Sequence, residues 1–371
     1  MPPESQGCSS AAIQSLIDQL EGHGLNMHSY MIIRNDYVIA EGYWHPFHAA
    51  RQHRLYSSGK TVVALAIGLL ADRGQISLTD PVVRFFPDKC PADLHPFVSA
   101  MTIRDLLIMA APFTGDCYWY GCTDRVRAFL ADKPTHAPGT RFDYNTSATY
   151  ALVAIVERLT GMTFLEAMRP GLLDPIGVSQ EIRCLKLPDG FSTGGSGILC
   201  TQRDFAKIAL LLQNKGQWRG QQLISLSFID AMNTAQINNA RPGEVPHLDT
   251  GFGYGYQLWM TQNHSYSMIG MGDQLAICYP EKKLTFSCMA DNQGNPAARK
   301  LIFQLVQTEI VDQLADHAIE ADPAARENLA MKNMSLVLAP CPGATGSPLA
   351  DQINGRVRSE ERRVGKECRS R

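Results

Sequence analysis

Segments with the pattern of β-strands lie toward both ends of this 371-residue chain, and the stretch between them reads mainly as helices. Near the start, two strands at residues 29–34 and 37–43 are expected to form a hairpin around Asn35-Asp36. Four more strands are expected later in the chain, at residues 253–261, 266–268, 274–279 and 284–290. Because strands at both ends enclose a helical middle, we predict an α+β fold. One antiparallel sheet of N- and C-terminal strands is flanked by helices and carries a helical insertion subdomain at about residues 75–200.

Apolar periodicity and end signals predict the longer helices. They are expected from Ser9 or Ser10 to Glu21, over the apolar run from Lys60 to Arg73, from Ser147 to Leu159, from Thr201 to Asn214, and from Pro296 to Leu314. Gly74 and Gly161 are natural stops, because glycine adopts the left-handed backbone conformation that commonly ends a helix.

Composition and charge restrict the class of protein. Hydrophobic residues make up 45% of the chain and charged residues 19%, which excludes a disordered chain, a collagen and a coiled-coil rod. The formal net charge is −2, so neither nucleic acid nor a membrane is expected as a partner. The sequence shows neither a secretory leader nor an apolar run of the roughly 18–20 residues that a membrane helix needs.

Cysteine usage indicates a reducing compartment. Most of the ten cysteines stand singly in apolar runs, as Cys278 and Cys288 do, which is typical of buried thiols. Cys117 and Cys122 are close enough to pair or to bind a metal, but no second Cys/His pair at ligand spacing accompanies them. We therefore expect free thiols and a cytoplasmic location.

The strongest chemical signal is Ser57-Ser58-Gly59-Lys60, an S-x-x-K pattern at the start of a predicted helix. Spacing three on a helix places the Ser57 hydroxyl and the Lys60 amine on one face, within hydrogen-bond reach. A lysine that is desolvated there can lose its proton and act as a base. Taken alone, the four residues fit a helix cap with a solvated lysine better than a catalytic pair, so the interpretation depends on the rest of the chain.

Three further segments could complete a site. Tyr144 precedes a predicted helix and could face Ser57 as a second proton relay, or simply pack as an aromatic side chain. Gly270-Met271-Gly272-Asp273-Gln274 could bring a backbone N–H close to an oxyanion, or form a tight hairpin. Gly194–Gly197 could form a cleft wall or a flexible turn.

These elements, in this order and spacing, resemble the serine β-lactamase and penicillin-binding-protein superfamily. The resemblance is to its class C-like branch of esterases, D-amino-acid peptidases and 6-aminohexanoate-dimer hydrolase-like proteins. The resemblance spans about residues 25–312 and includes the sequences around the motifs, at residues 65–87, 101–110 and 138–161. It implies the β-lactamase/transpeptidase-like fold and chemistry that proceeds through an acyl-enzyme without a metal or an organic cofactor.

By position, Ser57 resembles the acylated nucleophile of this family, Lys60 its base and Tyr144 the tyrosine that shuttles the proton. The third family motif falls at Met268-Ile269-Gly270. The resemblance therefore implies that the backbone N–H of Met271, which follows Gly270, completes an oxyanion hole with the N–H of Ser57.

Two departures bear on the substrate. Thr146 replaces the asparagine of the family's Tyr-x-Asn, and Met268 replaces the cationic or imidazole residue that commonly recognises a β-lactam carboxylate. Both changes favour esterase or amidase chemistry over a true β-lactamase. Trp119, one of three adjacent aromatic residues at 118–120, could line an acyl pocket or belong to a packed loop. His45, His48 and His53 lack a carboxylate or thiol partner and are expected to be structural, so no metal is expected.

The sequence thus predicts a serine hydrolase that acts on a small ester or amide, with a non-catalytic ligand-binding or sensor protein that retains the fold as the alternative. The sequence indicates neither whether the substrate is an ester or an amide nor which oligomeric state the protein adopts.

We expect residues 1–314 to form the hydrolase domain and residues 315–371 to be a linker and a disordered or truncated basic tail. Proline and glycine mark this segment, and residues 355–371 hold seven basic and three acidic residues.

Overall fold

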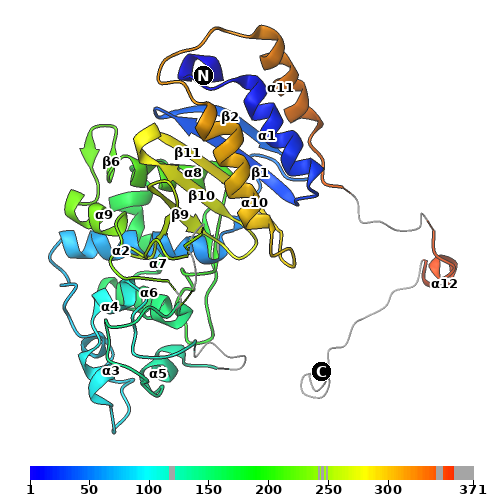
Figure 1. The fold of residues 1–371 in the computed structure, drawn as a ribbon. Helices are drawn as coiled ribbons and strands as arrows, with labels where there is room; N and C mark the ends of the chain where they lie inside the picture. The colour runs from blue at the N-terminus through cyan, green and yellow to red at the C-terminus, as the bar shows by residue number, and fades with distance from the viewer. Residues whose placement is uncertain (117–121, 241–242, 244–245, 248–249, 340–345, 355–371) are drawn as a thin grey trace. The chain divides into compact units, whose positions relative to one another are not determined.

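The computed structural model describes the whole chain except residues 117–121, 241–242, 244–245, 248–249, 340–345 and 355–371 (Figure 1). The chain divides into two units, Met1–Leu338 and Ala339–Arg371. The first unit contains the sheet and the helices described below. In the second, the described residues form one short helix, α12 (Ala350–Ile353).

A six-stranded antiparallel sheet forms one layer of the first unit (Figure 1), with strand order β2-β1-β11-β10-β9-β8. Its strands are β1 (Met27–Arg34), β2 (Tyr37–Tyr43), β8 (Trp259–Thr261), β9 (Ser265–Ile269), β10 (Leu275–Tyr279) and β11 (Leu284–Ala290). Tyr30 of β1 lies opposite Cys288 of β11, so strands from the N- and C-terminal parts of the first unit pair directly. The predicted α+β fold with a sheet of N- and C-terminal strands is confirmed.

Local signals account for the first hairpin. Asn35 and Asp36 have φ angles of 48° and 70°, and two consecutive left-handed residues give the turn that best matches the twist of paired strands. Asparagine and aspartate tolerate this conformation better than other non-glycine residues. The predicted turn pair therefore directs β2 back along β1.

The two faces of the sheet pack against different helices. On β11, Phe286 joins a core cluster with Ile13 of α1 (Ser10–Gly22) and Ile302 of α10 (Ala298–Leu305). The next residue, Ser287, accepts a hydrogen bond of 2.7 Å from Gln202 of α8 (Gln202–Gln213). Because successive side chains of a strand point to opposite faces, α1 and α10 cover one face and α8 covers the other.

A helical subdomain fills the middle of the chain. Its helices are α2 (Gly59–Asp72), α3 (Pro96–Ala100), α4 (Ile103–Leu107), α5 (Arg125–Leu130), α6 (Thr146–Thr160) and α7 (Phe164–Met168), with α9 (Leu226–Met232) after α8. A small three-stranded sheet has the order β3-β5-β4, with β3 (His53–Arg54), β4 (Arg183–Cys184) and β5 (Ile198–Cys200), and β6 (Gln217–Trp218) pairs with β7 (Gln221–Gln222).

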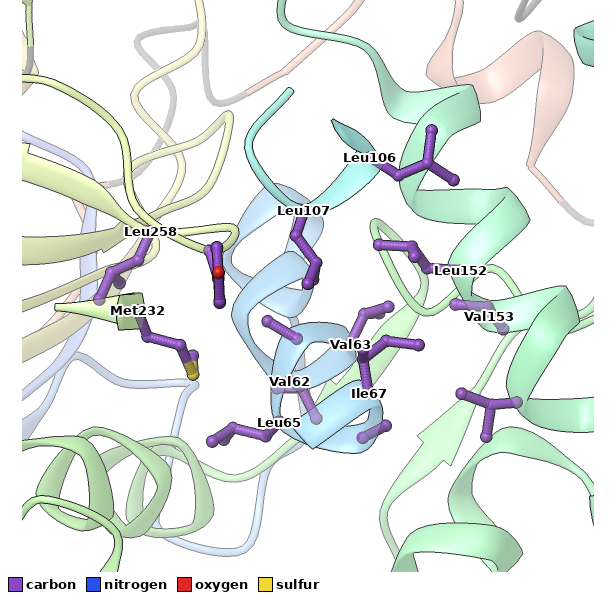
Figure 2. Close-up of a cluster of buried hydrophobic side chains, with 14 of the residues drawn as sticks. Val62, Val63, Leu65, Ile67, Leu106, Leu107, Leu152, Val153, Met232 and Leu258 are labelled. Carbon is purple, nitrogen blue, oxygen red and sulfur yellow. The ribbon is translucent and has the colours of Figure 1, made fainter. Parts of the chain in front are cut away.

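Helix α2 is buried on all sides. Figure 2 shows Val63 and Ile67 of α2 pointing toward Leu152 of α6, while Met232 and Leu258 lie on the other side of the helix. A helix that is apolar all round lies inside a domain rather than on its surface. The first turn of α2, which contains Lys60, is therefore held rigidly between the helical subdomain and the sheet.

Two predicted boundaries differ from the structure. The strand expected at residues 253–261 is a strand only at Trp259–Thr261, apart from isolated bridges made by Tyr254. Gly253 and Gln257 have φ angles of 96° and 53°, which interrupt an extended strand. The helix expected to reach Leu314 is α-helical only to Leu305 and continues as a π-helical turn at Val306–Ile310.

The expectation of a linker from residue 315 is wrong for its first part. Helix α11 (Pro323–Ser335) begins at the cap Asp322, whose side chain accepts a bond from the Ala325 N–H. Helix α11 packs along α1. Lys332 Nζ forms ion pairs of 2.6 Å with Asp18 Oδ1 and with Glu21 Oε2. Residues 355–371, predicted to be a basic tail, lie outside the described residues. No helix within the described part of the chain combines the length and apolarity required to cross a membrane.

Candidate active site

Ser57 lies in a short 3₁₀ turn, Tyr56–Ser58, immediately before α2. Tyr56 has a φ of 48°, a left-handed conformation that is strained for an aromatic residue. The neighbouring Ser58 hydroxyl donates a 2.5 Å hydrogen bond to the Gln274 carbonyl, which ties the turn to the start of β10. The Ser57 side chain is half-buried, so it is both positioned and accessible.

Lys60 lies in the first turn of α2 and is almost fully buried, with 1% of its surface exposed. Its Nζ lies 3.1 Å from Ser57 Oγ, 3.1 Å from the Gly195 carbonyl oxygen and 3.4 Å from Thr146 Oγ1. Burial lowers the pKa of the Lys60 amine from 10.5 to about 7, and the charge of Asp116 partly opposes this shift. A substantial fraction of Lys60 is therefore neutral near neutral pH.

The three oxygen partners match the hydrogen-bonding capacity of a neutral amine. A neutral lysine has two N–H donors and one lone pair. The Gly195 carbonyl can only accept, and the Thr146 hydroxyl can accept the second N–H. The lone pair is then directed at the remaining partner, the hydroxyl of Ser57, so the arrangement suits proton transfer from serine to lysine.

Tyr144 lies on the other side of the lysine. The Lys60 Nζ is 5.0 Å from the centroid of the Tyr144 ring, within cation–π range for the protonated amine. Tyr144 immediately precedes α6, whose cap is Asn145. The structure thus brings Ser57, Lys60 and Tyr144 together, although they are far apart in the sequence.

Asp116 holds the beginning of α6. Its carboxylate accepts hydrogen bonds from the Thr146 N–H at 2.7 Å and from the Ser147 N–H at 3.2 Å, and it also accepts the Ser147 hydroxyl. A carboxylate at a helix N-terminus is favoured by the free N–H groups and by the helix dipole. Asp116 therefore fixes the segment that presents Tyr144 and Thr146 to Lys60.

The Gly194-Gly195 segment forms the wall behind Lys60. A Cβ added to Gly195 would lie 2.8 Å from Thr149 Cγ2, and one added to Gly59 would lie 2.4 Å from the Gly194 carbonyl oxygen. Glycine is required at 59 because the two backbones approach so closely, and at 195 because the Thr149 side chain fills the space of a Cβ. This contact places the Gly195 carbonyl against the lysine amine.

The loop that follows β9 lies directly beside the serine turn. A Cβ on Gly270 would lie 2.5 Å from the Leu55 carbonyl oxygen, and the Gly270 N–H donates to the Gln274 carbonyl at 2.9 Å. Gln274 in turn donates from Nε2 to the Ala290 carbonyl of β11 at 2.7 Å. Among the described residues, the N–H of Met271 donates no hydrogen bond to another group.

Met268 and Met271 have opposite environments. Met268 is 1% exposed and belongs to the core, whereas the Met271 side chain is 56% exposed. No cationic or imidazole side chain therefore occupies the position that Met268 fills. Trp119, predicted as a wall of an acyl pocket, lies outside the described residues.

Three residues near the site have roles that were not predicted from the sequence: Asp116, Trp259 and Gln274, the last residue of the Gly270–Gln274 segment. The Trp259 ring stacks on the Tyr144 ring, with centroids 5.2 Å apart. Asp116 could have been recognised only as the acidic neighbour of the 118–120 aromatic run. Within the described chain, no group of three or more His, Cys, Asp or Glu side chains is placed to hold a metal.

An antiparallel sheet joined to a helical subdomain, with a serine–lysine pair at the start of the central helix, defines a protein of the β-lactamase and penicillin-binding-protein fold. The model of the Beta-lactamase family matches residues 13–308. The chain therefore belongs to the Beta-lactamase family.

Known relatives include hydrolases. The 6-aminohexanoate-dimer hydrolase of Paenarthrobacter ureafaciens is 23% identical over 269 residues, which cover 66% of this chain and 67% of that protein. A putative 6-aminohexanoate-dimer hydrolase from Bacillus anthracis has a similar structure, with a TM-score of 0.66, 17% identity, and coverage of 84% of this chain and 86% of that one. A putative beta-lactamase from Bacteroides dorei has a TM-score of 0.64 at 19% identity and covers 80% and 98% of the two chains.

Proposed function

We propose that this protein is a serine hydrolase that cleaves a small ester or amide through an acyl-enzyme. The observation that supports this most directly is the 3.1 Å separation between Ser57 Oγ and the Nζ of a buried lysine whose pKa lies near 7. A hydroxyl becomes an effective nucleophile when an adjacent base can take its proton. Membership in a family that contains hydrolases agrees with this assignment.

In the first step, neutral Lys60 takes the Ser57 proton while Ser57 Oγ forms a bond to the substrate carbonyl carbon. The developing oxyanion is held by the backbone N–H groups of Ser57 and Met271. Removing one such donor costs about 2.7–4 kcal/mol in comparable sites.

In the second half of acylation, the bond between the carbonyl carbon and the leaving oxygen or nitrogen breaks. Tyr144, next to Lys60, relays the proton to the leaving atom. Water then attacks the acyl-Ser57 ester by the reverse proton route and releases the acid. The chemistry requires neither a metal nor an organic cofactor.

The proposed substrate is a small ester or amide without a carboxylate at the position where many β-lactams have one. Met268 is a buried apolar residue at the position where relatives commonly present a cation or an imidazole. The site therefore lacks this means of recognising an anion. Nucleic acids and membranes are not proposed as partners, in keeping with the net charge of −2.

A fluorophosphonate probe tests the nucleophile. Intact-mass measurement is expected to show one adduct on the wild-type protein, mapped to Ser57, and none on Ser57→Ala. Ser99→Ala, an exposed serine on α3, is the control and is expected to label normally. An adduct that persists in Ser57→Ala would exclude the assignment.

Turnover separates this proposal from a non-catalytic ligand-binding or sensor protein that retains the fold. The panel consists of p-nitrophenyl esters, D-amino-acid amides and nitrocefin. The hydrolase is expected to release product over many cycles with at least one ester or amide. Stoichiometric acylation with no further release would favour the sensor.

We also propose a cytoplasmic location. The described cysteines are all free, as expected in a reducing compartment. Fractionation of source cells tests this, and recovery with secreted or envelope proteins would contradict it.

A further inference from the structure

A cavity of about 980 Å³ opens beside Tyr144. The residues on its wall that matter here are Arg141, Phe142, Asp143, Tyr144, Asn238 and Trp259. Because the Tyr144 ring centroid lies 5.0 Å from Lys60 Nζ, the cavity reaches the residue proposed to relay the proton. Neither the proton transfer nor the oxyanion hole uses it.

Aromatic rings form a rigid wall of this cavity. Trp259 stacks on Tyr144 at 5.2 Å, and the Phe142 ring meets Trp259 edge-on at 5.9 Å. The ring of the fully buried Tyr254 packs against both, with its centroid 4.9 Å from that of Trp259 and 5.2 Å from that of Phe142. Phe142, Tyr144 and Trp259 are each half-buried, so part of each ring remains free to contact a ligand. Preformed aromatic surfaces of this kind bind planar apolar groups with little loss of entropy.

The charges on the wall compensate one another. Arg141 lies 3.9 Å from Asp143, and the Asp143 carboxylate also accepts a hydrogen bond of 3.1 Å from the Gly115 N–H. Asp143 is therefore already paired and does not offer a free carboxylate to a cationic ligand. The other polar groups on the wall, including Asn238, are uncharged. The cavity thus fits a neutral ligand with hydrogen-bonding capacity better than an ion.

We propose that this cavity binds the leaving group of the substrate, and that this leaving group is an uncharged aromatic alcohol or amine. The inference rests on the proposed function, in which Tyr144 gives a proton to the leaving atom. That atom must then lie within reach of Tyr144, and the group attached to it extends along the Phe142–Trp259 wall. For a benzyl ester, the Ser57 Oγ–carbonyl bond forms, the carbonyl–benzyloxy bond breaks, and the proton originally on Ser57 leaves on benzyl alcohol.

Acetate esters that share one acyl group and differ only in the alcohol test this. The series is methyl, cyclohexylmethyl, benzyl and 4-carboxybenzyl acetate. We expect kcat/KM for benzyl acetate to exceed that for methyl acetate by about tenfold or more, because stacking adds to the burial of apolar area. Benzyl is expected to exceed cyclohexylmethyl, and 4-carboxybenzyl to fall below benzyl. Equal values for benzyl and methyl, or a preference for the carboxylate, would overturn the inference.

Variants of Trp259 locate the effect. Trp259→Leu is expected to reduce the benzyl-to-methyl ratio of kcat/KM by about fivefold or more, and Trp259→Phe, which keeps a ring, to retain most of it. Phe97→Leu replaces an exposed aromatic on α3, outside the cavity, and is expected to leave the ratio unchanged. A ratio unaffected by Trp259→Leu would contradict the assignment, and if that variant does not fold, the wild-type ester series still decides.

Different results would overturn the leaving-group site and the serine hydrolase assignment. Turnover of all the esters without preference would overturn the leaving-group site and leave the serine hydrolase intact. Absence of both turnover and a Ser57 adduct would overturn both.

Discussion

At the scale of single residues, the site depends on removing Lys60 from water. Its amine is 1% exposed, and its three partners are oxygens of Ser57, Thr146 and Gly195. Desolvation penalises the ammonium form, so the fold converts a side chain that is normally cationic into a base at neutral pH. The same burial costs stability, which is typical of a residue retained for chemistry.

The pH dependence of acylation follows from this shift. The pKa of Lys60 is lowered to about 7, and the active form is the neutral amine. The rate is therefore expected to be low in acid, to rise about tenfold per pH unit below the pKa, and to level off above it. The rate of Ser57 labelling by the fluorophosphonate, measured from pH 5 to 9, checks this. A rate that still rose about tenfold per pH unit between pH 8 and 9 would show an ordinary lysine pKa and contradict the structure.

Thr146 gives a second prediction at this scale. Its hydroxyl lies 3.4 Å from Lys60 Nζ and occupies the position of the family's asparagine. Thr146→Val keeps the shape but removes the acceptor, and a buried N–H without a partner costs about 1–3 kcal/mol. We expect acylation to slow by about tenfold, with a changed pH midpoint. Thr146→Ser is the control and should restore both. If Thr146→Val labels at the wild-type rate, Thr146 has no part in holding the lysine.

At the scale of elements, helices and strands with strong local sequence signals at their ends were predicted, and an element without such signals was not. The hairpin at Asn35-Asp36 and the caps at Ser9 and Thr201 lie within a few residues of the helices or strands that they define. Helix α11 was missed because it buries only Ala325 and Leu329, which is too few for a visible apolar stripe. Its cap, Asp322-Pro323, also fits a loop.

The role of α11 can be tested by truncating its buried contact. Leu329 is 5% exposed and belongs to the core cluster with α1, whereas Met334 on the same helix is 80% exposed. Leu329→Ala is expected to lower the free energy of unfolding by about 2 kcal/mol or more, and Met334→Ala by less than about 0.5 kcal/mol. Urea denaturation measures both. Equal, small effects would mean that residues 323–335 behave as the linker first expected.

At the scale of the whole molecule, the site is assembled from segments that meet only after folding. Ser57 and Lys60 precede and open α2, Tyr144 precedes α6, and Met271 follows β9. The sequence predicted these candidate residues through a family resemblance. It could not identify Gln274 or Asp116, because their roles arise from hydrogen bonds to Ser58 and Thr146 across the fold. Nor could it show that a buried wall of Gly194-Gly195 supplies an acceptor to Lys60.

This assembly predicts that reactivity and folding are lost together. The serine turn is tied to the sheet through Gln274, and α2 is packed between the sheet and α6, so opening either layer separates the reacting groups. We therefore expect the sheet and the helical subdomain to open together. In increasing urea, brief fluorophosphonate pulses should give a Ser57 labelling midpoint that coincides with that of far-UV circular dichroism. The Met334→Ala variant serves as a control with unchanged midpoints. Loss of labelling at clearly lower urea would show that the site opens by local unfolding before the sheet does, and the two layers would then be less strongly coupled than the hydrogen bonds of Gln274 indicate.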